Sequence, residues 1–227
     1  MARLRKSRKF FGAAGLHADA PGCPSGASAD FFALDPRELF TEAAPLEVEL
    51  GAGKGDFILE RARMFPRHNF LAVELAGSVC QWLAIRVARS GLSNLRAVRA
   101  DARSVVNLML PAHSVRAFHI YFPDPWPKSR HSRHRLITAS LIRGLARCLE
   151  PGGRAYLATD VQWYFEQAGA LLHQGGFRIG EASVAGAQRT NFGRRFAAEG
   201  KAIYAGCFER AADAGVPAQC APPAATV

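Results

Sequence analysis

The stretch from Phe122 to Arg135 combines a carboxylate, an indole and a run of basic side chains in the order Phe-Pro-Asp-Pro-Trp-Pro-Lys-Ser-Arg-His-Ser-Arg-His-Arg. Its three prolines stiffen the backbone around Asp124 and Trp126, because each ring fixes its own φ and keeps the preceding residue extended. A carboxylate on such a loop is suited to chemistry, and the basic residues after it are suited to a polyanion. The stretch therefore predicts a site for a base that is attached to phosphates.

Simpler interpretations apply to the same residues. Asp-Pro and Pro-Trp are common in turns, and basic residues in the first turns of a helix usually form a solvated face. His131 and His134 are spaced to face one metal ion, but the arginines around them repel a cation and no Cys or acid completes a ligand set, so we expect no metal. The position after an apolar strand favours a ligand site, since open α/β sheets bind ligands there.

Alternating strand and helix patterns position this loop. Apolar runs predict strands at 46–50, 70–74, 95–100, 116–122 and 155–158, with strand-like segments at 177–179 and 202–208. Helical periods span 56–64, 78–90 and 136–149, and Thr159-Asp160 is expected to cap a further helix that runs to 172. The pattern predicts one α/β domain with seven mostly parallel strands, right-handed crossovers and helices on both faces.

Composition bounds the organisation and the partners of the chain. Its 227 residues favour a single domain, and 29 Lys and Arg against 19 Asp and Glu give a net charge of +10, which favours nucleic acid or another acidic partner. Five scattered cysteines without a C-x-x-C pair indicate a reducing, cytoplasmic setting, and no apolar run is long enough to cross a bilayer. We expect a basic arm and flexible linker at 1–30, the domain at 31–210 and a disordered tail at 211–227.

A glycine turn follows the first predicted strand. Gly51, Gly53 and Gly55 let the backbone approach a ligand closely at the start of a helix. A dinucleotide-binding turn would place its third glycine at position 56, but Asp56 stands there and would repel a pyrophosphate. The spacing thus favours a nucleoside cofactor without phosphates.

Four carboxylates lie at or near strand ends: Glu49, Glu74, Asp101 and Asp124. Glu74 is placed to accept hydrogen bonds from ribose hydroxyls, and Asp101 from an adenine amino group. Glu49 lies inside a strand, where a carboxylate is costly unless it faces solvent or meets a cation. Each one alone is also an ordinary cap or turn residue, but the ordered set favours S-adenosylmethionine, which carries an ammonium and a sulfonium, over NAD.

Several motifs together resemble the bacterial tRNA (guanine-N7)-methyltransferase family. They are Val48-Glu-Leu-Gly-Ala-Gly53, Val73-Glu74, Ala100-Asp101, Phe122-Pro-Asp-Pro-Trp-Pro-Lys-Ser-Arg-His131, Ala158-Thr-Asp160 with Tyr164, and Thr190-Asn-Phe192. The match runs from about Leu46 to Arg210. It implies a Rossmann-like class I methyltransferase domain that uses S-adenosylmethionine to methylate N7 of a guanine in the tRNA variable loop.

The resemblance also implies roles for individual residues. Cofactor positions are Glu49, Gly51, Gly53, Glu74, Asp101 and Asp124; Asp124 is also catalytic; Lys128, Asp160 and Thr190 bind substrate; Arg130, Arg133 and Arg135 contact RNA. One departure is Gly193, where the family has a glutamate that binds substrate. If this departure has cost a substrate contact, Gly193→Glu is expected to raise activity.

The sequence also leaves alternative functions open and predicts the partners of the chain. The alternatives are a methyltransferase acting on another RNA position or on an exocyclic amine, and a non-catalytic RNA-binding relative. The Trp after Asp-Pro and the long basic run favour the tRNA interpretation over the exocyclic amine. We expect tRNA as partner, no membrane, no obligatory protein partner, and a monomer or homodimer in the cytoplasm.

Overall fold

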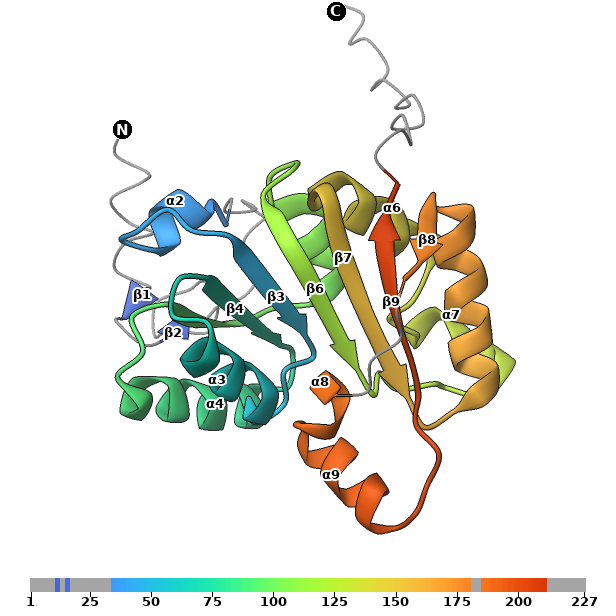
Figure 1. Cartoon of the computed structure of the whole chain (residues 1–227). Coiled ribbons are helices and arrows are strands. Elements are labelled where there is room, and N and C mark those ends of the chain that lie inside the picture. The colour runs from blue at the N-terminus through green and yellow to red at the C-terminus, as the bar shows by residue number, and fades with distance from the viewer. Residues whose placement is uncertain (1–10, 13–14, 17–33, 181–184, 212–227) are drawn as a thin grey trace, which may run out of the picture.

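One central sheet organises the computed structural model, which describes residues 11–12, 15–16, 34–180 and 185–211 (Figure 1). The strands are β1 (Phe11–Gly12), β2 (Gly15–Leu16), β3 (Leu46–Leu50), β4 (Asn69–Glu74), β5 (Leu95–Arg99), β6 (Val115–Tyr121), β7 (Leu149–Thr159), β8 (Phe177–Ile179) and β9 (Tyr204–Arg210). Their order in space is β1-β2-β5-β4-β3-β6-β7-β9-β8. Neighbours from β5 to β7 are parallel, and β9 is antiparallel to β7 and β8. The predicted seven-stranded, mostly parallel sheet is confirmed, and the two-residue strands β1 and β2 extend its β5 edge.

Helices cover both faces of the sheet, as predicted (Figure 1). They are α2 (Pro36–Leu39), α3 (Asp56–Met64), α4 (Gly77–Ser90), α5 (Ala102–Ser104), α6 (Ala139–Cys148), α7 (Gln162–Gln174), α8 (Ala185–Gln188) and α9 (Asn191–Ala198), with a π-helical turn η1 (Val105–Met109) and a 3₁₀ segment η2 (Ser129–His134). Strand β4 shows how the layers form, because its side chains alternate between faces. Phe70 and Ala72 pack with α3 and α4, whereas Leu71 and Val73 pack in the core under α6 and α7.

Two predicted helix starts are wrong by a few residues. The helix expected from Leu136 begins at Ala139, where the Thr138 hydroxyl accepts the Leu141 amide at 3.2 Å and acts as the N-cap. In the helix expected after Thr159-Asp160, Val161 stands at the N-cap position and no side chain caps the helix, because the Thr159 hydroxyl accepts the Val161 amide in the preceding turn. In both cases an extended segment outside the apolar period precedes the helix.

Short elements account for most of the remaining differences. Helices α2, α5, α8 and α9 and the two non-α turns have no counterpart among the elements predicted from the sequence, and all are short. Of the three predicted segments of the chain, the arm and linker at 1–30 and the tail at 211–227 lie almost wholly outside the described residues. No helix in the described ranges is both long and apolar enough to cross a membrane.

The strand order reverses between β3 and β6. From β3 the chain builds outward through β4 to β5, and it then returns to place β6 on the other side of β3. Connections that leave neighbouring parallel strands in opposite directions open a crevice at the carboxyl ends of those strands. The fold therefore predicts a site above β3 and β6, next to the proline-rich loop after β6.

Candidate active site

A cleft of about 640 Å³ opens at that position. It is lined by the glycine turn after β3, the ends of β4 and β5, the loop after β6 and the start of α9. Of the predicted site residues, the cleft brings together Glu49, Gly51, Gly53, Glu74, Asp101, Asp124 and Thr190. Lys128, Arg130, Arg133, Arg135 and Asp160 do not line it.

Glu74 fastens the glycine turn to the end of β4. Its Oε2 accepts the Gly53 amide at 2.9 Å, and its Oε1 accepts the Ala76 amide at 2.8 Å. Gly51 and Gly53 have φ angles of 81° and 56°, a left-handed conformation that favours glycine. Each carboxylate oxygen keeps a further lone pair for a ligand donor. The predicted turn is thus a rigid support with an acceptor at its centre.

Asp101 is held in place by the first residues of the short helix that it caps. Oδ1 accepts the Arg103 amide at 2.8 Å, and Oδ2 pairs with the Arg103 guanidinium at 2.9 Å. Burial raises the pKa of Asp101, but the bonds from Arg103 and the Ser104 amide outweigh it and leave the pKa below its usual value. The carboxylate is therefore ionised, and it faces the cleft with much of its bonding capacity already used.

Glu49 is the buried acid of the cleft. Its side chain is only 3% exposed, and Oε2 has no hydrogen-bond partner among the described residues. Burial raises the pKa of Glu49 well above its usual value, and the negative charges of Asp56 and Glu74 raise it further. A buried acceptor without a partner is costly, and it fits a ligand that brings a cationic donor to it. Burial excludes the alternative in which this strand carboxylate faces solvent, and its contact with a cation stays a prediction.

The Glu49→Gln variant is expected to stabilise the ligand-free protein at pH 8, with a gain that shrinks toward pH 5. Below the usual pKa of 4.5 the carboxyl is protonated in both folded and unfolded chains and contributes nothing to the pH dependence. Above it, the unfolded chain loses the proton and the folded chain retains it, so folding becomes less favourable as pH rises. Urea unfolding from pH 5 to 8 measures this, with exposed Glu42→Gln as control. A gain that does not change with pH would contradict it.

The loop that carries Asp124 is held in an unusual backbone conformation. Phe122 and Trp126 have backbone φ angles of 52° and 41°, which residues other than glycine rarely adopt. Arg135 holds the loop: its Nε donates to the Pro125 carbonyl at 3.0 Å and its Nη2 to the Trp126 carbonyl at 3.0 Å. No hydrogen bond or ion pair within the described ranges uses the exposed Asp124 carboxylate. It is left available to a ligand.

The basic residues after the loop divide into two groups. Arg135 is committed to the loop and lies over the Trp163 ring at 4.9 Å, so its role in RNA contact stays a prediction. Lys128, Arg130 and Arg133 are exposed on or beside η2. The Trp126 ring lies against the rings of His131 and His134, with centroids 5.7 and 5.3 Å away. These rings brace the base of η2, which agrees with a supporting role for the tryptophan.

Helices α8 and α9 form the far wall of the cleft. Thr190 caps α9: its hydroxyl accepts the Gly193 amide at 2.9 Å and donates to the Ala187 carbonyl at 2.7 Å. A Cβ at Gly193 would lie 1.9 Å from the Ala187 carbonyl oxygen. The expectation that a glutamate at position 193 can restore a contact is therefore wrong, because α8 passes too close to α9 for any side chain there.

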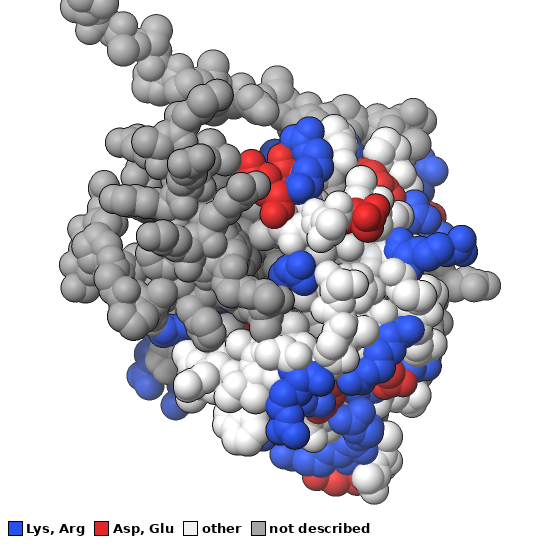
Figure 2. Space-filling view, turned by 90° about the vertical axis from the view of Figure 1, so that its left-hand side faces the viewer, with Lys and Arg blue, Asp and Glu red and all other residues white. Residues whose placement is uncertain are grey.

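Ion pairs tie this wall to the opposite side of the cleft. Asp56, at the start of α3, pairs with Arg86 of α4 at 2.6 Å and with Arg194 of α9 at 3.1 Å. Arg189, just before α9, pairs with Glu60 of α3. Figure 2 shows the side of the molecule that lies on the left in Figure 1. Lys and Arg side chains gather in its lower part, and α9 lies at the lower end of the molecule in Figure 1. The wall is thus fixed by charge as well as by packing.

Several lining residues were given no role from the sequence, although Asn191 and Phe192 belong to the Thr190-Asn-Phe192 motif. Tyr121 and Phe57 line the cleft, and Asn191 and Phe192 contribute to the α9 wall. Phe192 is 52% exposed, and its ring centroid lies 6.3 Å from that of Phe122. An exposed aromatic ring beside a polar motif was the available signal for Phe192, whereas Tyr121 and Phe57 are apolar-pattern residues that sequence alone assigns to the core.

The comparisons with known proteins agree with one another. The sequence family described as putative methyltransferases matches residues 43–205. The chain is 37% identical to the tRNA (guanine-N(7)-)-methyltransferase of Nitrosococcus oceani, over 79% of this chain and 78% of that protein. It is 33% identical to the protein of the same name from Syntrophotalea carbinolica, over 78% and 76%. With that of Paracidovorax citrulli the identity is 42%, but the match spans only about half of that relative's length, 54%, and 59% of this chain.

Solved structures support the fold. A structure described as an antibiotic-related methyltransferase matches with a TM-score of 0.59 and 19% identity, over 76% of this chain and 91% of that one. The 16S rRNA methyltransferase KamB matches with a TM-score of 0.58 and 17% identity, over 77% and 92%. At such identities the likeness concerns the Rossmann-like methyltransferase fold and not the substrate.

Proposed function

The chain belongs to the tRNA (guanine-N(7)-)-methyltransferase family, and on that basis we propose that it transfers a methyl group from S-adenosylmethionine to N7 of a guanine in the tRNA variable loop. The proposal rests on the observation that one cleft holds two carboxyl groups that differ in burial and surroundings. Glu49 is buried with an unpaired oxygen, and Asp124 is exposed on the loop that leads into the basic segment. The first suits a cationic nucleoside and the second suits a reacting base.

The residues of the cleft fit S-adenosylmethionine, which supplies an activated methyl group when bound. Glu49 offers its unpaired oxygen to a cationic group, and Glu74 offers acceptor lone pairs beside the glycine turn. Gly51 and Gly53 leave open space above the turn, since a Cβ at either position meets no atom within 4 Å. Asp101 closes this side of the cleft with its ionised carboxylate. An acidic cradle of this kind would repel phosphate groups, and it favours a cationic nucleoside over a nucleotide.

Guanine N7 has an available lone pair and no proton at neutral pH, so the reaction needs no general base. The work of the protein is to align the base and to stabilise the positive charge that develops on the purine. Asp124 is the residue for that second task, because its carboxylate is free of other partners. The α9 wall, with Asn191 and Phe192, bounds the place where the base would lie. Lys128 and Asp160, which do not line the cleft, stay predictions as substrate contacts.

Labelled S-adenosylmethionine incubated with bulk tRNA from a strain lacking this activity tests the proposal. We expect label in tRNA with the parent protein and none with heat-treated protein. A chain that binds tRNA without transferring label would be a non-catalytic RNA-binding relative. Label in ribosomal RNA or protein, and none in tRNA, would contradict the substrate.

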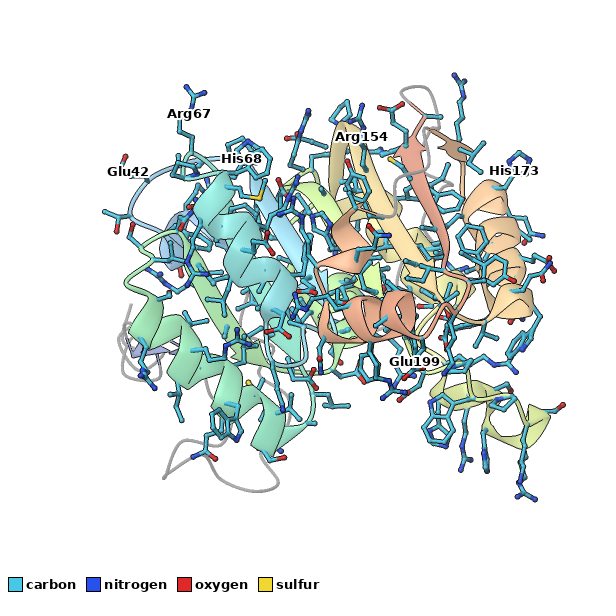
Figure 3. All side chains as sticks on the ribbon, turned by 60° about the horizontal axis from the view of Figure 1, so that its bottom comes forward. Glu42, Arg67, His68, Arg154, His173 and Glu199 are labelled. Carbon is cyan, nitrogen blue, oxygen red and sulfur yellow. The ribbon has the colours of Figure 1, made fainter. Side chains whose placement is uncertain are left out.

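RNA affinity is expected to depend on salt through Arg130 and Arg133. Each arginine that neutralises a phosphate adds roughly 0.7–0.9 to the slope of log affinity against log salt. An Arg130→Ala, Arg133→Ala variant should therefore flatten the slope by about 1.4–1.8 for tRNA. The control is Arg67→Ala, Arg178→Ala, which removes two exposed arginines elsewhere. Figure 3 shows Arg67 at the upper left edge of the view, away from Glu199 after α9. An unchanged slope in the first variant would mean that these residues face solvent only.

The oligomeric state, the need for a protein partner and the location of the chain stay predictions. The expectations of a monomer or homodimer, of no obligatory protein partner and of a cytoplasmic location rest on composition and on the resemblance. Within the described ranges no group of three or more His, Cys, Asp or Glu side chains is arranged to hold a metal ion. We propose that the transfer uses the residues of the cleft.

A further inference from the structure

A line of polar side chains runs under α3 along the middle of the sheet. Glu47 near the start of β3, His119 in β6 and Tyr121 at the end of β6 lie on the same face (Figure 1 shows the two strands side by side). Glu47 is 1% and His119 2% exposed. The His119 Nε2 lies 2.8 Å from Glu47 Oε2, and its Nδ1 lies 3.1 Å from the Tyr121 hydroxyl. The three side chains thus form one continuous hydrogen-bonded chain.

Glu47 fixes one end of this chain as an anion. Its carboxylate accepts the Arg61 Nε at 2.8 Å and lies 2.9 Å from the His68 Nδ1. Burial raises its pKa, but the bonds from His119 and Arg61 outweigh that effect and hold the pKa well below its usual value. Figure 3 shows His68, which contacts this anchored end, in the upper left of the view, away from Glu199 after α9.

The anion at Glu47 sets the tautomer of His119. Burial keeps the pKa of His119 below its usual value, so the ring is neutral and carries one N–H. That proton lies on Nε2, because only a donor can face an ionised carboxylate at 2.8 Å. Nδ1 is then an acceptor, and the Tyr121 hydroxyl must donate to it. The Tyr121 proton points toward His119, and only oxygen lone pairs remain for other partners.

Tyr121 meets the cleft beside Glu49. Both residues line it, and Glu49 and His119 are register partners on adjacent strands. The Phe57 ring meets the Tyr121 ring edge-on with centroids 4.9 Å apart, and a Cβ at Gly186 would lie 2.4 Å from the hydroxyl. The hydroxyl therefore has little freedom to move. Burial raises the pKa of Tyr121 well above its usual value, so it stays a neutral phenol.

We propose that the Glu47–His119–Tyr121 chain is a positioning device that presents the Tyr121 oxygen as an acceptor to the ammonium group of the cofactor's amino-acid portion, together with the unpaired Glu49 oxygen. The inference rests on the proposed use of S-adenosylmethionine. An ammonium has three N–H donors and no acceptor, so it is complementary to the Tyr121 oxygen and to a Glu49 carboxylate that gives up its proton when the cation binds. If the hydroxyl turned its proton into the cleft, it would repel the same group.

Calorimetry with two ligands tests the role of Tyr121 in the full chain. The ligands are S-adenosylhomocysteine and its analogue with hydrogen in place of the amino group. Tyr121→Phe is expected to weaken S-adenosylhomocysteine by roughly 10-fold or more, as for the loss of a bond to a charged group, and to change the analogue by less than about 2-fold. The matched control is Tyr164→Phe, since the Tyr164 hydroxyl accepts the Ile137 amide away from the cleft. It should leave both affinities unchanged.

A double variant separates positioning from packing. If His119 acts through the Tyr121 hydroxyl, His119→Phe should weaken S-adenosylhomocysteine in the parent and have no further effect in Tyr121→Phe. Equal losses for both ligands in Tyr121→Phe, or no loss for either, would overturn the inference. A parent protein that binds the analogue but gains nothing from the amino group would overturn it as well. A folded parent that binds neither ligand would contradict the proposed function itself.

Discussion

Asp124→Asn is expected to lower the rate of tRNA methylation by about 10²–10³, the usual cost of removing one well-placed electrostatic contact. The substitution keeps the shape of the side chain and removes its charge. Asp124 lines the cleft without a hydrogen-bonded partner in the described part of the chain, so its charge is not used to hold the loop. The loop itself is held by Arg135 through the Pro125 and Trp126 carbonyls. The fold should therefore be unaffected.

Single-turnover rates with saturating tRNA and S-adenosylmethionine measure this effect, and thermal unfolding checks the fold. Glu42→Gln is the matched control, because it removes an exposed carboxylate that does not line the cleft; Figure 3 shows Glu42 on the far side of the molecule from Glu199 and α9. The control should retain the parental rate. An Asp124→Asn protein with full turnover would remove this carboxylate from the mechanism.

Gly193→Glu is expected to destabilise the protein and to lower its activity. A Cβ at this position would lie 1.9 Å from the Ala187 carbonyl oxygen and 2.9 Å from the Gln188 Cα, so α8 and α9 would have to separate. Overpacking of this kind typically costs about 1–3 kcal/mol, and backbone contacts relax less readily than side chains. The same shift would displace Thr190 and the rest of the cleft wall.

Urea unfolding and S-adenosylhomocysteine affinity measure the two consequences of Gly193→Glu. Gly193→Ala should show the same loss of stability, since the clash begins at Cβ. Ala197→Glu, at an exposed position of the same helix, should change stability by no more than about 0.5 kcal/mol. A stable and more active Gly193→Glu protein would mean that α8 and α9 are spaced differently in solution.

Local sequence patterns predicted the main helices and strands and the edge of the sheet where the site lies. Helix α3 begins at Asp56 and ends at Met64, as the apolar period and the glycine turn before it indicate. The carboxylates at the ends of β3, β4 and β5 meet in one cleft, because parallel strands bring their carboxyl ends to one edge. These features depend on residues close together in the sequence and on a topology that few alternatives satisfy.

The remaining features depend on contacts between residues far apart in the sequence, and such contacts limited what could be predicted. Leu46-Glu-Val-Glu-Leu50 has the alternation of a half-exposed strand, yet all five residues are buried. The burial of Glu47 requires Arg61 and His119, which lie 14 and 72 positions away. No local pattern contains that information.

The roles of residues in the α9 wall and in the loop after β6 could not be predicted for the same reason. In the sequence, Gly193 suggests the loss of the family's glutamate. In the structure, α8 lies so close that a Cβ at position 193 has no room, which explains the glycine. Arg135 belongs to a basic run that suggests RNA contact, whereas its guanidinium also reaches Gln167 of α7 at 3.2 Å. Such residues take their roles from tertiary neighbours, so sequence motifs alone assign them incompletely.

The central claim is that the methyl group goes to N7 of guanine in tRNA. Unmodified tRNA incubated with the parent protein and labelled S-adenosylmethionine, digested to nucleosides and resolved by mass spectrometry, tests it most directly. We predict labelled 7-methylguanosine, with its position mapped by partial digestion to the variable loop, and its loss in Asp124→Asn. Label in N2-methylguanosine, N6-methyladenosine or another exocyclic amine in place of 7-methylguanosine would contradict the account.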